Sequence, residues 1–62
     1  MDRTRQNADM MIQKCREDFH RLSKWEQDFL DSIEEQRAHW RRWLPSERQF
    51  ETLERIYAEK TS

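Results

Sequence analysis

Two serines, Ser23 and Ser46, each stand three residues ahead of a glutamate or a glutamine and directly before an apolar repeat. In this arrangement, a capping box, the serine oxygen and the later side chain accept hydrogen bonds from backbone N–H groups that the first helical turn leaves unpaired. The pairs Ser23/Glu26 and Ser46/Gln49 therefore predict two helix starts. Because the chain has no glycine and its one proline is Pro45, we expect an all-α fold of two to three helices that reverses direction around that proline.

A stripe of apolar residues precedes and crosses the first of these boxes. Its members are spaced alternately by four and three residues, and those of its first half are Ala8, Ile12, Cys15, Phe19 and Leu22. This is the spacing of the inward-facing positions of a coiled coil, so the stripe marks one face of a helix. The same count continues to Trp43, and only Glu26 and Gln36 are polar where the pattern predicts an apolar residue.

Two architectures fit this stripe. In one, Ser23 starts a new helix, and the first part of the chain forms helices over residues 7–21 and 24–43. In the other, residues 7–43 form one helix about 55 Å long at 1.5 Å per residue. The last helix alone is too short to cover it, so this version needs a second copy of the chain. The seam of that homodimer would consist of Ile12, Cys15, Phe19 and Leu22.

The last segment of the chain is also predicted to be helical. Apolar residues recur there at helical spacing, namely Phe50, Leu53, Ile56 and Tyr57, and they predict a helix over residues 47–60. A connection of about three residues would join it to the preceding helix, which favours antiparallel neighbours. We expect one domain over residues 1–62, with a helical hairpin around Pro45 and with residues 1–6 disordered.

The composition narrows the classes of function. Charged residues make up 40% of the chain but the net charge is only −1, so no global field favours nucleic acid. Cys15 is the only cysteine, which rules out an internal disulfide and favours a cytoplasmic location. No apolar run approaches the roughly 20 residues that span a bilayer.

Without glycine there is no phosphate-binding loop, and Cys15, His20 and His39 are too scattered for zinc. We expect no enzyme activity and no cofactor.

The segment from residue 37 to residue 43 is the first candidate binding site. Its arginines and tryptophans are Arg37, Trp40, Arg41, Arg42 and Trp43. These residue types are enriched at the energetic centres of protein interfaces, and cations interleaved with aromatic rings also bind single-stranded nucleic acid. In a third interpretation the tryptophans pack inside the hairpin, and the arginines stabilise the negative end of the helix.

A block of acidic residues on the same predicted helix is the second candidate. Asp28, Asp31 and Glu35 share one helical face because they are spaced by three and four residues. Such a face binds a basic partner, or it is simply the solvated side of the helix. Both interpretations remain open from the sequence.

Two runs of residues resemble a known module. The first is Leu22-Ser23-x-Trp25-Glu26-x-x-Phe29-Leu30-x-Ser32-Ile33, and the second is Ser46-Glu47-Arg48-Gln49-x-x-x-Leu53-x-x-Ile56-Tyr57. Together they resemble a short helical-hairpin module of phage and prophage proteins, which is sometimes appended to replication or recombination proteins. The resemblance covers residues 22–60. The chain departs from the module at Trp40, at Trp43 and at Pro45, where a turn that contains glycine is usual.

The resemblance implies an origin in mobile elements, and hence a bacterial cytoplasm as the place of action. It also implies a small protein that binds a host or phage protein complex, such as an inhibitor of host defence or replication machinery. Our first hypothesis is therefore a non-enzymatic interaction protein that forms a homodimer. The alternatives are a nucleic-acid-associated accessory of phage DNA metabolism and a plain coiled-coil oligomerisation element.

Overall fold

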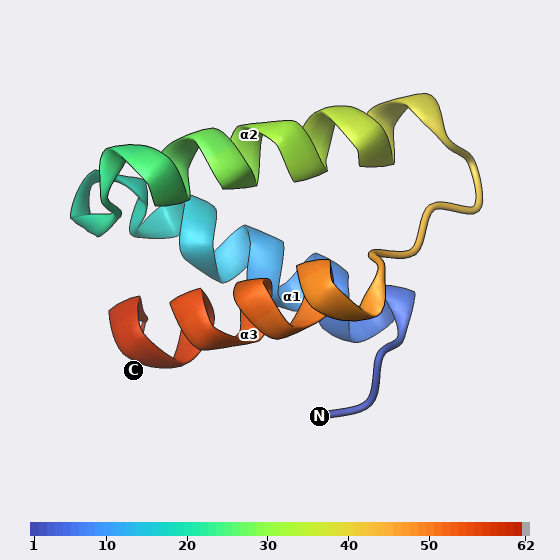
Figure 1. The fold of residues 1–62 in the computed structure, drawn as a ribbon, viewed down its shortest axis with the longest axis horizontal. Helices are drawn as coiled ribbons and strands as arrows, with labels where there is room; N and C mark the ends of the chain where they lie inside the picture. The colour runs from blue at the N-terminus through green and yellow to red at the C-terminus, as the bar shows by residue number, and fades with distance from the viewer. Residues whose placement is uncertain (62) are drawn as a thin grey trace.

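Residues 1–61 are described by a computed structural model, and they form three α-helices and no strand (Figure 1). The helices are α1 (Arg5–Glu17), α2 (Lys24–His39) and α3 (Glu47–Lys60), and a short 3-10 turn (Phe19–Arg21) separates the first two. In Figure 1, α2 and α3 run in opposite directions, and α1 crosses diagonally behind the space between them. The prediction of an all-α fold is confirmed.

The helix is interrupted before Ser23, and a new helix begins after it. The first half of the chain therefore contains two α-helices, and the alternative of one helix over residues 7–43 is wrong. The Ser23 hydroxyl oxygen accepts a hydrogen bond from the Glu26 backbone N–H at 3.2 Å, and Glu26 Oε1 accepts one from the Ser23 N–H at 2.8 Å. Leu22, directly before the cap, is extended and buried. The break folds the two halves of the apolar stripe toward each other, which removes both from water within one chain.

The first half of the apolar stripe forms the interior of the single chain. The buried residues of α1 and of the turn after it are Ala8, Met11, Ile12, Cys15 and Leu22, with Phe19 half-buried at their edge. They meet Leu30 and Ile33 of α2 and Phe50, Leu53 and Ile56 of α3 in one cluster. Because α1 packs against both other helices, and mainly against α3, the face predicted as the seam of a homodimer is already covered within one chain.

Helix α1 begins at Arg5, two residues before its predicted start and inside the segment that was predicted to be disordered. Thr4 Oγ1 accepts a hydrogen bond from the Asn7 N–H at 3.1 Å, which makes Thr4 the N-cap. Ahead of this cap, the amino group of Met1 lies 3.4 Å from the carboxylate of Glu54 on α3. No capping box marks this helix start, because no glutamate or glutamine stands three residues after Thr4.

Helix α2 ends at His39, four residues before its predicted end, because Trp40 leaves the helical conformation. The φ of −117° and ψ of 117° at Trp40 are those of an extended residue. As a result Trp43 turns into the core and is only 6% exposed, whereas Trp40 is 67% exposed. Residues 40–46 link α2 to α3 in place of the predicted three-residue connection, and α3 itself has the predicted bounds.

Two polar contacts, which we call the cap bridges, join α2 to α3 at both ends. At one end, Glu26 Oε1 lies 3.9 Å from Lys60 Nζ. At the other end, Gln49 Nε2 donates a hydrogen bond to Gln36 Oε1 at 3.2 Å. Since Glu26 and Gln49 are the downstream members of the two capping boxes, each bridge ties the start of one helix to the end of the other. The bridges use Glu26 and Gln36, the two polar residues that interrupt the apolar stripe.

We expect the bridge between Gln36 and Gln49 to appear as a coupling energy in a double-mutant cycle. Gln36→Ala removes the acceptor of the bridge and Gln49→Ala removes its donor, so the effects of the two substitutions on the free energy of unfolding should not add. The expected coupling is about 0.5–1 kcal/mol, measured by urea unfolding. A matched cycle that pairs Gln27→Ala with Gln49→Ala should give a coupling near zero, because Gln27 Nε2 donates instead to the Phe19 carbonyl. Equal couplings in the two cycles would contradict the bridge.

Candidate functional site: a basic corner with an exposed tryptophan

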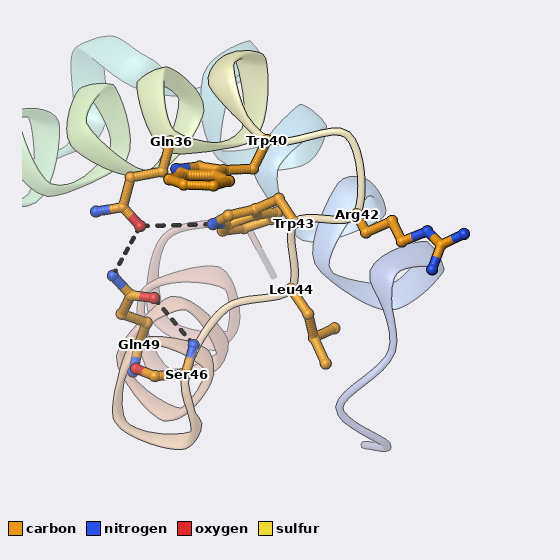
Figure 2. Close-up of a pocket in the computed structure, with 7 residues that line it drawn as sticks. All are labelled: Gln36, Trp40, Arg42, Trp43, Leu44, Ser46 and Gln49. Atoms are coloured by element: carbon orange, nitrogen blue, oxygen red, sulfur yellow. Dashed lines mark hydrogen bonds between the residues drawn. The ribbon is translucent and has the colours of Figure 1, made fainter.

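A groove of about 450 Å³ opens where α2, the connection after it and the start of α3 meet (Figure 2). The residues that line it are Gln36, Trp40, Arg42, Trp43, Leu44, Ser46 and Gln49. Trp43 is buried, while the indole of Trp40 and the side chain of Leu44 are exposed. The groove therefore combines a fixed aromatic residue with apolar side chains that water still contacts.

A small hydrogen-bond network fixes the shape of this groove. Gln36 Oε1 accepts hydrogen bonds from Trp43 Nε1 at 3.4 Å and from Gln49 Nε2 at 3.2 Å. Gln49 Oε1 in turn accepts one from the Ser46 N–H at 2.9 Å. The amide nitrogen of Gln36 points away from these partners (Figure 2) and has no hydrogen-bond partner within residues 1–61.

Arginines from the N-terminal segment join those of the connection after α2. Arg3 Nη1 donates to the Pro45 carbonyl at 3.1 Å, and Arg5 Nη1 donates to the Arg41 carbonyl. Arg41 and Arg42 are exposed, and neither forms an ion pair in the described part of the chain. We call this surface the basic corner; its residues are Arg3, Arg5, Trp40, Arg41, Arg42 and Leu44. Its excess of positive charge comes from Arg41 and Arg42, because Arg5 also lies 3.9 Å from Asp9 and Arg3 shares a hollow with Glu47, Glu51 and Glu54.

The predicted site of arginines and tryptophans divides into an exposed and a structural part. Trp40, Arg41 and Arg42 are all exposed, with the indole of Trp40 on one side of the connection and the side chain of Arg42 on the other (Figure 2). Trp43 belongs to the core, as the third interpretation of this segment had it. Arg37 is held by Asp9 of α1, with 2.6 Å between Nε and Oδ1, so its charge is balanced inside the chain.

The predicted acidic site is largely neutralised by bases of the same chain. The ion pairs are Asp28 with Lys24 at 3.0 Å, Asp31 with Arg16 at 2.8 Å, and Glu34 with Arg16; Glu35 lies 4.0 Å from His39, which carries a charge only when protonated. Hydrogen bonds to Glu34 and Asp31 raise the pKa of Arg16, so this guanidinium stays charged. The structure therefore brings Asp31 and Glu34 together on a cation of α1 and leaves no row of unpaired carboxylates along α2.

Sequence reasoning missed four residues that shape the basic corner. Arg3 and Arg5 lie far from the connection in sequence, and no local pattern links them to it. No sequence pattern singled out Leu44, apart from its position next to the predicted segment of arginines and tryptophans. Gln36 did carry one, because it is a polar residue in the apolar stripe, and such a position indicates a side chain with a specific hydrogen-bond partner.

Three further findings concern metal binding, the cysteine thiol and membrane crossing in residues 1–61. No cluster of three or more His, Cys, Asp or Glu side chains that could hold a metal ion is found among them. The thiol of Cys15 is buried, and burial followed by the nearby charges of Asp18 and Glu26 raises its pKa to about 11, so it is not a thiolate at neutral pH. None of these helices combines the length and the apolar character that crossing a bilayer requires.

Comparisons with protein families, with curated proteins and with solved structures find no match for this chain.

Proposed function

We propose that this chain is a non-enzymatic binding protein whose basic corner docks on an acidic segment of another protein that also carries a large apolar side chain. The observation that supports the proposal is Trp40, which is 67% exposed and is followed directly by two arginines without acidic partners among the described residues. A solvated indole costs free energy in the free protein, and a partner that covers it recovers that cost.

The basic corner has the composition of an interface centre. Tryptophan and arginine are the residues that most often contribute 2 kcal/mol or more to a protein interface. Trp43 and the Gln36–Gln49 hydrogen bond hold the groove in place before binding, so little conformational entropy is lost when a partner docks. Arg41 and Arg42 favour a partner with carboxylates by charge complementarity, which also speeds association.

The biological role that we propose follows from the resemblance of residues 22–60 to phage helical-hairpin modules. The target would be a protein complex of a bacterial host or of a phage, and the chain would inhibit host defence or replication machinery in the cytoplasm.

The alternative function is binding of single-stranded nucleic acid, and one observation favours it, namely an exposed tryptophan next to arginines. Single-strand binding needs base-stacking rings and phosphate-binding cations along one track. In Figure 2, the indoles of Trp40 and Trp43 point to one side of the connection and Arg42 points to the other. This arrangement supports a protein partner over a strand of nucleic acid.

The proposal is tested by selecting a library of random short peptides on the purified protein. We expect the selected peptides to combine Asp or Glu with a Trp, Phe, Leu or Ile residue. Trp40→Ala should weaken binding of the strongest peptide by about 30-fold, the equivalent of about 2 kcal/mol, measured by calorimetry. Trp25→Ala is the matched control, because Trp25 is similarly exposed but lies at the other end of α2, and it should leave the affinity unchanged.

Two outcomes would contradict the proposal. One is a set of selected peptides without acidic residues, or with an affinity that Trp40→Ala does not change. The other is tight binding of oligothymidylate with a strong dependence on salt concentration that the double variant Arg41→Ala/Arg42→Ala reduces, because that slope counts released counterions. This second result would establish the nucleic-acid alternative.

A further inference from the structure

A second aromatic surface lies at the opposite end of α2 from the basic corner. Trp25, in the first turn of α2, is 57% exposed. Its ring stacks on that of Phe29, one turn later, with 5.5 Å between ring centroids and 7° between ring planes. Phe29 is half-buried against the core, so it fixes the orientation of Trp25. Stacking on Phe29 therefore orients the indole, while more than half of the surface of Trp25 remains exposed.

Two opposite charges flank this aromatic pair. Lys24 Nζ lies 3.0 Å from Asp28 Oδ1, and both side chains are exposed. A lysine that stands four residues before an acid is in the weaker orientation for a pair within a helix, and its charge lies at the positive end of the helix dipole. The ion pair therefore adds little to the stability of the single chain, and both groups remain available to pair with charges of another molecule.

We propose that this surface binds the same surface of a second copy of the chain, with the two α2 helices antiparallel. In a two-fold symmetric contact, if residue i of the first copy touches residue j of the second, then residue j of the first copy touches residue i of the second. Lys24 of each copy then pairs with Asp28 of the other, and the two Trp25–Phe29 stacks cover each other. We call this surface, made of Lys24, Trp25, Asp28 and Phe29, the self-association face.

Charge selects a second copy as the occupant of this face. A lysine and an aspartate one helical turn apart are complementary to their own two-fold image, and the face has no net charge that would favour a strongly acidic or basic partner. The basic corner has the opposite property, because its two-fold image would place arginine on arginine. The inference does not rest on the proposed function of the basic corner.

The area of the face sets the strength of the expected dimer. One fully buried aromatic side chain removes about 150–250 Å² from water. In this contact, two tryptophans that are about half exposed would be covered, together with the exposed edges of two phenylalanines. The total falls below the roughly 1,200 Å² of a stable interface. The dimer is therefore weak, and the fraction of chains in the dimer rises with protein concentration. Antiparallel α2 helices would place the two basic corners at opposite ends of the dimer.

Charge reversal tests this arrangement sharply. Lys24→Glu gives a face with two acids, and Asp28→Lys gives a face with two bases. Each variant alone should associate at least tenfold more weakly than the wild type in sedimentation equilibrium at low ionic strength, where surface charges are least screened. An equimolar mixture of the two should associate at least as well as the wild type, and the double variant Lys24→Glu/Asp28→Lys should recover the wild-type association. Trp25→Ala should abolish it.

The controls separate this face from the rest of the surface. Glu51→Lys and Arg55→Glu change matched charges on the exposed side of α3 and should dimerise as the wild type does, as should Trp40→Ala. Circular dichroism checks that each variant keeps its helices. A wild type that stays monomeric at every soluble concentration would overturn the proposal. Single reversals that associate as well as the wild type, or a mixture that associates no better than its components, would overturn it equally.

Discussion

Replacing Leu53 with alanine is expected to leave most of the protein unfolded at 25 °C. Leu53 lies in the middle of α3 with 0% of its surface exposed, and α3 packs mainly against α1. A buried leucine replaced by alanine loses about 2–5 kcal/mol of stability through the lost transfer energy and the remaining cavity. The core of a domain with fewer than about 70 residues seldom supplies more than about 3–5 kcal/mol in total. The substitution therefore removes most of the stability, which far-UV circular dichroism with urea titration would measure.

Leu44→Ala is the matched control for this substitution. The chemical change is identical, but Leu44 is 43% exposed, so its effect on the free energy of unfolding should stay within about 0.5 kcal/mol. If the two variants were equally stable, α3 would not be packed on α1 as described. Because Leu44 lines the groove, the same variant should weaken binding of the selected peptides while the protein stays folded.

The second large expected effect is a loss of stability in alkali that depends on Cys15. Its pKa is raised from 9.0 to about 11 in the folded chain, first by burial and then by the charges of Asp18 and Glu26. The folded chain therefore keeps this proton at a pH where the unfolded chain has released it. The stability that depends on this proton is fully present below pH 9 and is lost as the pH rises toward 11. Two pKa units correspond to about 3 kcal/mol, roughly half of which is lost by pH 10.

Cys15→Ala isolates this effect from other groups that titrate in alkali. All other ionisable groups are present in both proteins, so the difference in unfolding free energy between wild type and variant should fall by about 2 kcal/mol from pH 8 to pH 11. Urea titrations at several pH values measure this difference. A difference that does not change with pH would mean that the Cys15 thiol reaches water in the folded chain, and a thiol reagent at pH 8 would then modify it without unfolding.

The parts of the fold that depend on local chemistry were predictable from the sequence. Both capping boxes place their helix starts correctly, because Ser23 and Ser46 bond to groups only three residues away. The end of α2 was placed wrongly, because it depends on where Trp43 finds a buried site, and that site is built by residues distant in sequence. Helical spacing alone treated Trp40 and Trp43 as equivalent, whereas the structure buries one and exposes the other.

The apolar stripe shows a different limit of sequence reasoning. Its spacing identified the buried face of α1, but the same spacing suits a seam between two chains and a core within one. The decision depends on whether α2 and α3 can fold back over the stripe, which is a property of the whole chain. The polar residues in the stripe were the feature of the sequence that indicated a core within one chain. Glu26 and Gln36 make contacts with α3 that only a folded-back arrangement provides.

The candidate site was predicted as a segment and not as a surface. The exposed members Trp40, Arg41 and Arg42 were all named from sequence. Arg3 and Arg5 were not, because their hydrogen bonds to carbonyl oxygens of the connection join positions more than 30 residues apart. The pairing of Arg37 with Asp9 was equally unreadable, because it depends on how α1 crosses α2.

The cap bridges have a consequence for how the molecule opens. Helices usually fray first at their ends, where hydrogen bonds are fewest. Here the start of α2 is tied to the end of α3, and the start of α3 is tied to the end of α2. Loosening one terminus therefore removes a contact from the other helix, which couples the two helices into a single cooperative unit. Amide hydrogens at these four ends should then exchange with solvent largely through global unfolding, so that neither α2 nor α3 offers a loose end at which a protease could begin.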